Sequence, residues 1–118
     1  LAVGLGGALG AISRYLLGLV ILPWGAFPLG TFIINIVGCF CMGVLMTVIA
    51  ERQLLPAAWR LFLCVGFLGG FTTFSSFGYE AISLMNQGKL LEALGYVGGS
   101  VLLGLAAAAI GVYIGRVL

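Results

Sequence analysis

The third apolar segment of the chain carries the side chains best suited to ion chemistry. The stretch from Gly66 to Glu80 gathers glycine, threonine, serine and phenylalanine in the middle of a long hydrophobic run. The adjacent Gly69 and Gly70 weaken a helix, and a threonine hydroxyl just after them can cap a new helix start. The pattern predicts a discontinuous helix, with one half before Gly69 and a second half from about Phe74.

Two interpretations of this interruption remain open from the residues alone. Unwound backbone deep in a membrane must be satisfied by protein, water or an ion. Its carbonyls would suit a small cation, and the second half-helix would present a partly positive N-terminus to an anion. The alternative is a glycine kink that serves only helix packing.

The aromatic and polar residues after the glycines also allow two interpretations. Phe74 and Phe77 are three apart and share a helix face. They either pack in the core or turn the positive edges of their rings toward an anion. Ser75 and Ser76 could donate hydrogen bonds beside them. Glu80 is the only carboxylate well inside an apolar segment, and such an acid is a functional candidate.

Three further polar residues lie inside the other segments. Asn35 is the only amide in the middle of an apolar run. It could tie helices together or donate N–H groups to an anion, and both roles stay open. Tyr96 and Ser100 are one helical turn apart. Because their hydroxyls would be costly against lipid, we expect them to face protein or water.

Four hydrophobic segments position these residues. Prolines, charges and polar turns divide the chain into residues 1–22, 29–50, 59–85 and 90–118. Each reaches the length of about 20 residues that a helix needs to cross a bilayer. We therefore expect an all-α integral membrane protein, with one four-helix domain over residues 1–118 and the third helix broken at the membrane midplane.

Composition supports this class and excludes others. The chain is 63% hydrophobic and 7% charged, whereas a soluble domain is about 25% charged. The net charge of +2 comes from scattered residues, which argues against nucleic-acid binding. The chain has no histidine, no paired carboxylates and no phosphate loop, so no enzyme constellation is present. Its cysteines lie in apolar runs and are interpreted as small buried hydrophobes.

Charge and glycine patterns bear on topology and assembly. Basic residues split three to two between the two membrane sides, a weak orientation signal that favours insertion both ways round. Residues ahead of Leu1 could instead carry the deciding charges. Glycines at spacings of four could serve packing within the chain or a dimer, and spacing does not separate these. The basic residues are Arg52, Arg60 and Arg116 on one side, and Lys89 and Arg14 on the other; the glycines are Gly6, Gly10, Gly18, Gly95, Gly99, Gly111 and Gly115.

These residues resemble the Fluc (CrcB) family of fluoride channels over essentially the whole chain. Three ordered motifs carry the resemblance: residues 6–15, residues 30–38, and residues 66–77 together with Glu80. The resemblance implies a dual-topology antiparallel homodimer in the bacterial inner membrane. It further implies two fluoride pores, passive export of fluoride down its gradient, and a structural sodium ion at the dimer centre.

The resemblance also implies roles for individual residues. Those that contact the anion would be Asn35, Phe74 and Phe77; the polar lining would be Ser75, Ser76, Glu80, Tyr96 and Ser100; the sodium donors would be the carbonyls of Gly69 and Thr72. The role of Arg14 stays open. Ser76 stands where the family often has threonine. Gly104 stands where a second serine of the fourth segment can occur in the family, which puts that part of the polar lining in doubt.

Two rival classes explain less of the sequence. A small four-helix exporter that couples cations to protons requires a carboxylate in its first segment. The only charged residue in the first segment of this chain is Arg14. A purely structural membrane subunit would explain the glycines. It would leave the polar and aromatic cluster around Thr72, Thr73 and Phe74 without a purpose.

Overall fold

The computed structural model describes all residues, 1–118, and is entirely helical apart from its turns. Four helices are long and apolar enough to cross a membrane: Ala2–Val20, Leu29–Glu51, Arg60–Asn86 and Leu90–Val117. The prediction of an all-α chain with four potential membrane spans is therefore confirmed.

The spans are built from seven helical pieces. The first span is α1 (Ala2–Val20), the second is α2 (Leu29–Met46) with a π-helical end η1 (Thr47–Glu51), and the fourth is α5 (Leu90–Val117). The third span begins with the π-helical η2 (Arg60–Leu68), continues as the short α3 (Gly69–Phe71), and resumes after a gap as α4 (Ser75–Asn86).

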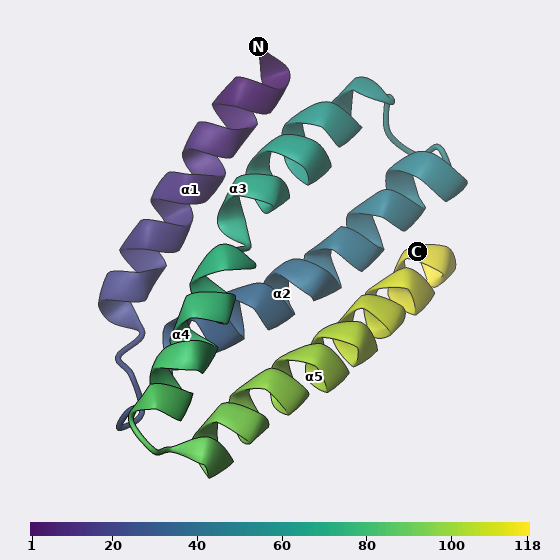
Figure 1. The fold of residues 1–118 in the computed structure, drawn as a ribbon. Coiled ribbons are helices and arrows are strands. Elements are labelled where there is room, and N and C mark those ends of the chain that lie inside the picture. The colour runs from purple at the N-terminus through teal and green to yellow at the C-terminus, as the bar shows by residue number, and fades with distance from the viewer.

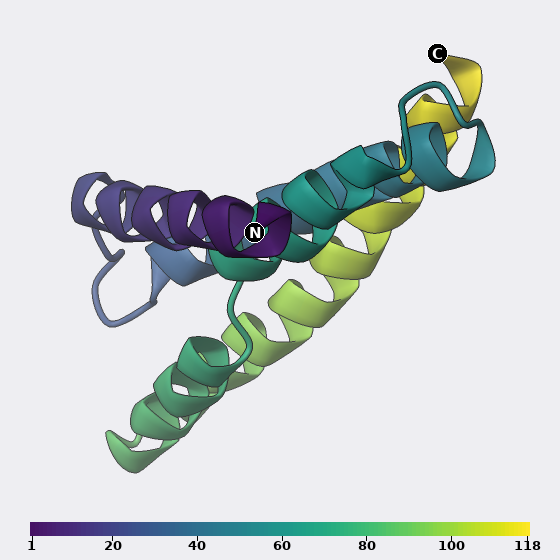
Figure 2. The same cartoon turned by 90° about the horizontal axis from the view of Figure 1, so that it is seen from above.

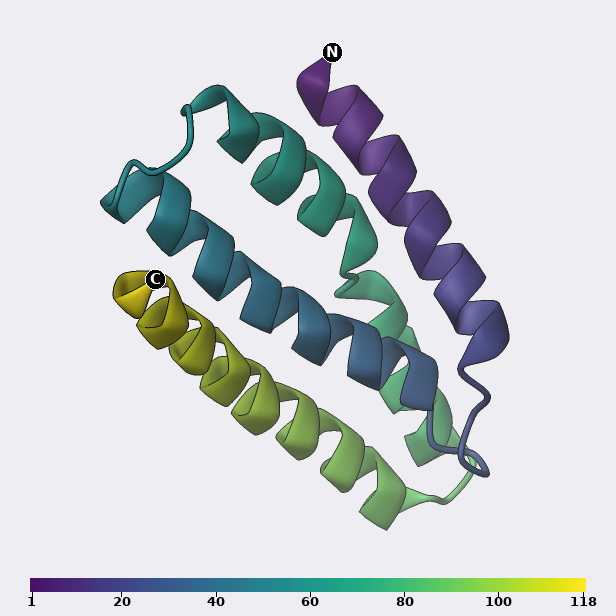
Figure 3. The ribbon, with the colours of Figure 1, turned by 180° about the vertical axis from the view of Figure 1, so that it is seen from behind.

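The four spans run back and forth, so that both chain termini lie at the same end (Figures 1 and 3). Within the bundle, α2 lies along α5, and α1 lies along η2 and α3. The view from above shows α4 diverging from α1 together with the first half of α5 (Figure 2). This divergence opens space between α1 and α4, on the side of the 21–28 turn.

Few residues of the single chain are buried. Only 18 of 118 residues are buried, and many large apolar side chains lie on the outside. A water-soluble domain could not tolerate such a surface. The exposed apolar side chains suit surroundings of lipid or of another hydrophobic helix.

Glycines let the paired helices approach closely. A Cβ atom added to Gly10 of α1 would run into the backbone carbonyl of Phe67, and one added to Gly111 of α5 would run into that of Phe40. These glycines therefore serve packing within the chain. By contrast, nothing lies within 4 Å of the Cβ position of Gly18 or Gly95.

This difference predicts opposite effects of alanine at two glycines of α1. Gly10→Ala should destabilise the folded chain by about 2 kcal/mol, because the methyl group overlaps backbone that cannot rotate away. Gly18→Ala meets open space and should leave stability unchanged or slightly raised. Thermal unfolding in detergent measures both. Equal loss of stability in the two variants would contradict the close-packing argument.

Candidate functional site

The third span is interrupted just after α3. Thr72 is extended, with φ −86° and ψ 158°, and helix resumes at Ser75. The backbone N–H and the hydroxyl of Thr72 donate to the Leu68 carbonyl, at 3.0 and 2.9 Å. These bonds extend the helical ladder over Gly69–Phe71. The expected start of unwinding at Gly69 is therefore wrong, and the non-helical residues are 72–74.

Asn35 of α2 clamps the backbone of this interruption. Its Nδ2 donates to the Thr73 carbonyl at 2.9 Å, and the Thr73 N–H donates to its Oδ1 at 2.9 Å. The side chain therefore ties two helices together, which was one of its two possible roles. Because an amide NH₂ has two donors, this pair leaves one Nδ2–H for another acceptor. The Thr73 hydroxyl accepts the Ser76 N–H, in the first turn of α4, at 3.3 Å.

The interruption changes the partners of nearby carbonyls. In an unbroken helix the Thr73 N–H would donate to the Gly69 carbonyl, but here it donates to Asn35. The Gly70 carbonyl accepts Nε of Arg14 at 3.2 Å, whereas no backbone or side-chain donor within the chain reaches the Thr72 carbonyl. Carbonyls of this kind are hard oxygen donors. Gly69 and Thr72 therefore fit a small hard cation such as sodium.

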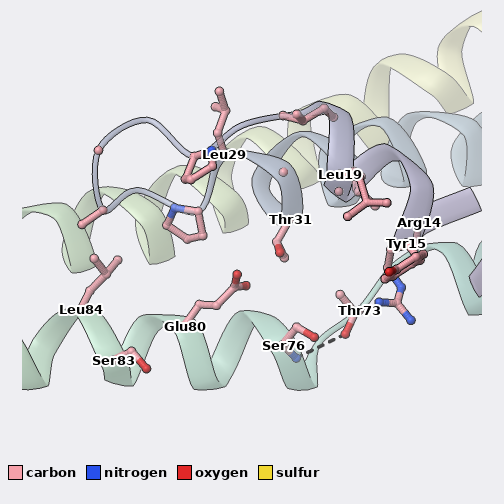
Figure 4. Close-up of a pocket in the computed structure, with 18 of the residues that line it drawn as sticks. Arg14, Tyr15, Leu19, Leu29, Thr31, Thr73, Ser76, Glu80, Ser83 and Leu84 are labelled. Atoms are coloured by element: carbon pink, nitrogen blue, oxygen red, sulfur yellow. Dashed lines mark hydrogen bonds between the residues drawn. The ribbon is translucent and has the colours of Figure 1, made fainter.

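A first cavity of about 640 Å³ lies between α1, the turn after it, and α4 (Figure 4). Arg14 of α1 and Glu80 of α4 both border this cavity, yet they form no ion pair with each other. A cation and a carboxylate facing one space make it suited to water and ions. Its polar lining consists of Arg14, Thr31, Thr73, Ser76, Glu80, Ser83 and Gln87.

A second cavity of about 380 Å³ lies on the α2 and α5 side of the interruption. The Ser100 hydroxyl is buried there without a hydrogen-bond partner. An unpartnered buried hydroxyl is free to bind a ligand or water. Thr73 lines both cavities. The second lining comprises Asn35, Gly38, Cys39, Met42, Thr72, Thr73, Phe74, Phe77, Ser100, Val101 and Ala108.

The aromatic residues form a graded series from surface to core. Phe74 is 74% exposed, and its ring centroid lies 5.7 Å from that of Phe77. Phe77 in turn lies 5.1 Å from Tyr96, which is fully buried. The Tyr96 hydroxyl donates to Glu80 at 3.0 Å. This bond fixes the Glu80 side chain beside the first cavity.

The structure thus distributes the residues singled out from the sequence over several environments. Asn35, Phe74, Phe77 and Ser100 line the second cavity, whereas Ser76 and Glu80 line the first. Tyr96 lies behind Glu80. Ser75 is exposed and lines neither cavity, although its hydroxyl is 3.5 Å from that of Thr73.

Thr73 is the residue that sequence reasoning undervalued. The sequence indicates a helix cap and a member of the polar and aromatic cluster, but not that Thr73 bonds to Asn35 and Ser76 and lines both cavities. The helical register restarts after an interruption, so periodicity could not say which of two neighbouring threonines faces a cavity. The tandem threonines themselves were the only available signal.

Comparisons with known proteins agree over nearly the whole chain. Residues 1–112 match the family model described as CrcB-like protein, Camphor Resistance (CrcB). The chain is 51% identical to the "Fluoride-specific ion channel FluC" of Chloroflexus aurantiacus, covering 98% of this chain and 94% of that protein. It is 47% identical to "Fluoride-specific ion channel FluC 2" of Nocardia farcinica, over 94% and 80%. It is 45% identical to the FluC of Solibacter usitatus, over 98% and 97%.

Proposed function

Because this chain belongs to the CrcB-like protein family, we propose that it is a fluoride-specific ion channel. The observation that carries this function is that the chain is 45% to 51% identical, over 98% of its length, to bacterial proteins of that name. The chain is a multi-pass bacterial membrane protein and not an enzyme. The alternative of a cation- or proton-coupled exporter has no support from these relatives. We assign it to the inner membrane, where it would let fluoride leave down its gradient.

The anion path in this proposal runs past the second cavity. Fluoride is strongly hydrated, so each group lining the path must replace part of its water shell. The free Nδ2–H of Asn35 and the unpartnered hydroxyl of Ser100 are donors for this purpose. The ring edges of Phe74 and Phe77 add weak positive potential. Polar groups that continue the path are Ser75, Ser76, Glu80 and Tyr96.

The channel in this proposal is an antiparallel homodimer with two pores. Support comes from the weak bias of basic residues between the two ends and from exposed groups at the interruption. Both Phe74 and Gly69 are exposed in the single chain. A partner of the same chain would cover them and complete the walls of the second cavity.

Dual insertion is expected to make each end of the four-helix bundle accessible from both sides of a membrane. Asn86→Cys, in a background without the native cysteines, places a reactive thiol at the exposed C-terminal residue of α4, next to the Gly88 turn. We expect membrane-impermeant reagents to label it partly from outside and completely after permeabilisation. Labelling from one side alone would exclude dual insertion.

A structural sodium ion at the dimer centre is the third part of the proposal. The carbonyls of Gly69 and Thr72, from each of the two chains, would hold it. Gly69 lacks the amide that a continuous helix would supply, and Thr72 has no intrachain donor. When bound, the cation neutralises the carbonyl dipoles where lipid cannot.

Ion efflux from liposomes tests the proposed function directly. Vesicles loaded with fluoride or with chloride, and carrying the purified protein, should release fluoride down its gradient and retain chloride. The rate should be indifferent to an imposed proton gradient. Equal release of both anions, or fluoride moving uphill when a proton gradient is imposed, would contradict a passive fluoride channel.

A further inference from the structure

Arg14 of α1 holds the third span at its interruption. Its Nε donates to the Gly70 carbonyl at 3.2 Å, between residues 56 positions apart in the chain. The two helices are in close contact there, because a Cβ on Gly70 would lie 2.5 Å from the Gly7 carbonyl. The guanidinium forms no salt bridge. A charge within a membrane-spanning helix is costly, so its bond to this carbonyl requires an explanation.

The interruption alters several carbonyls that a continuous helix would satisfy. The Gly70 carbonyl accepts Nε of Arg14 and the Thr73 carbonyl accepts Nδ2 of Asn35, whereas those of Gly69 and Thr72 receive no such donor. We infer that Arg14 is a positioning residue: by holding the Gly70 carbonyl through Nε, it leaves the carbonyls of Gly69 and Thr72 to face the proposed cation. This inference rests on the cation site of the proposed function.

The need for such a residue follows from the local sequence. Two adjacent glycines give the end of α3 more backbone freedom than other residues would. Asn35 fixes the chain beyond the interruption, at Thr73, from α2. Arg14 fixes it before the interruption, at Gly70, from α1. A positive group at the C-terminal end of a helix is also favourable for the helix dipole.

The competing role for Arg14 is attraction of anions into the first cavity by its charge, since the residue lines that cavity. Three substitutions separate the two roles. In Arg14→Gln the amide nitrogen takes the chain position of Nε, so the donor is kept and the charge is lost. Arg14→Lys keeps the charge but carries its donors further out. Arg14→Met removes both while keeping the length.

Two quantities are measured for each variant of the whole chain. The first is fluoride efflux from liposomes. The second is the sodium concentration at which the unfolding temperature in detergent has risen by half of its maximal increase. Arg14→Gln should stay within about threefold of the wild type in both. Arg14→Lys and Arg14→Met should lose about tenfold in efflux and need about tenfold more sodium, the effect of one lost hydrogen bond. Hydrogen exchange of the Thr72–Phe74 amides should rise in the same two variants.

Each contrary outcome has a separate meaning. If Arg14→Lys behaves like the wild type and Arg14→Gln loses efflux, the charge of Arg14 matters and the positioning role is wrong. If all three variants behave like the wild type, the positioning role is also wrong. If Arg14→Met fails to fold, the Gln and Lys variants decide alone. Absence of any sodium effect on the wild type, with normal efflux, would reject the cation site and this inference together. Absence of wild-type fluoride efflux would reject the channel itself.

Discussion

Asn35→Asp is expected to reduce fluoride efflux by about a hundredfold or more, because it damages two functions of one side chain. Aspartate has the same shape and can still accept the Thr73 N–H. It places an oxygen where Nδ2 now donates to the Thr73 carbonyl at 2.9 Å, so two acceptors face each other. Its negative charge also borders the second cavity and repels an anion there.

Two further variants separate these effects in the same liposome assay. Asn35→Ala removes the clamp without adding a charge, and we expect it to lose efflux with some loss of stability. Met42→Leu is the matched control, because Met42 lines the same cavity from the same helix and makes no hydrogen bond. It should stay within about twofold of the wild type. Normal efflux through well-folded Asn35→Asp would remove Asn35 from both proposed roles.

Phe74→Ile should suppress fluoride efflux while leaving the fold intact. The Phe74 ring is 74% exposed in the single chain and borders the second cavity, so its truncation cannot open a hole in the chain's own core. Isoleucine keeps an apolar surface and removes the positive ring edge. An apolar wall without compensating dipoles repels a strongly hydrated ion. We expect at least about a tenfold loss of efflux, with a dimer still present by size-exclusion chromatography, because isoleucine keeps an apolar side chain against the partner.

Phe77→Ile should suppress efflux too, but with a loss of stability, because Phe77 packs against buried Tyr96 at a centroid distance of 5.1 Å. Methionine at either position should be milder, since it is flexible and polarizable. Tyr79→Ile is the control: Tyr79 is 76% exposed on the same helix and lines neither cavity. Normal fluoride efflux through a well-folded double variant, Phe74→Ile with Phe77→Ile, would show that both rings serve only packing.

The number of helices able to span a membrane could be predicted from the chain alone. Span length and hydrophobicity are local properties, because each helix satisfies its own backbone in lipid, and four such helices are present. The residue types available for chemistry could also be identified from the sequence. They are few charges, one central amide, and a cluster of glycine, threonine and phenylalanine. Family membership followed from the same ordered motifs, which the comparisons confirmed.

Close packing decided what individual residues in those motifs do. Spacing could not distinguish Gly10, pressed against the Phe67 carbonyl, from Gly18, which faces open space, because that depends on which helix lies opposite. The residues that leave the helix are 72–74, since the Thr72 hydroxyl and amide both bond back to Leu68. Asn35 became a clamp on Thr73, and Arg14 a partner of Gly70, only where α2 and α1 meet the third span. Hydrogen bonds between residues 38 or 56 positions apart leave no trace in local pattern, because their geometry exists only after the helices pack.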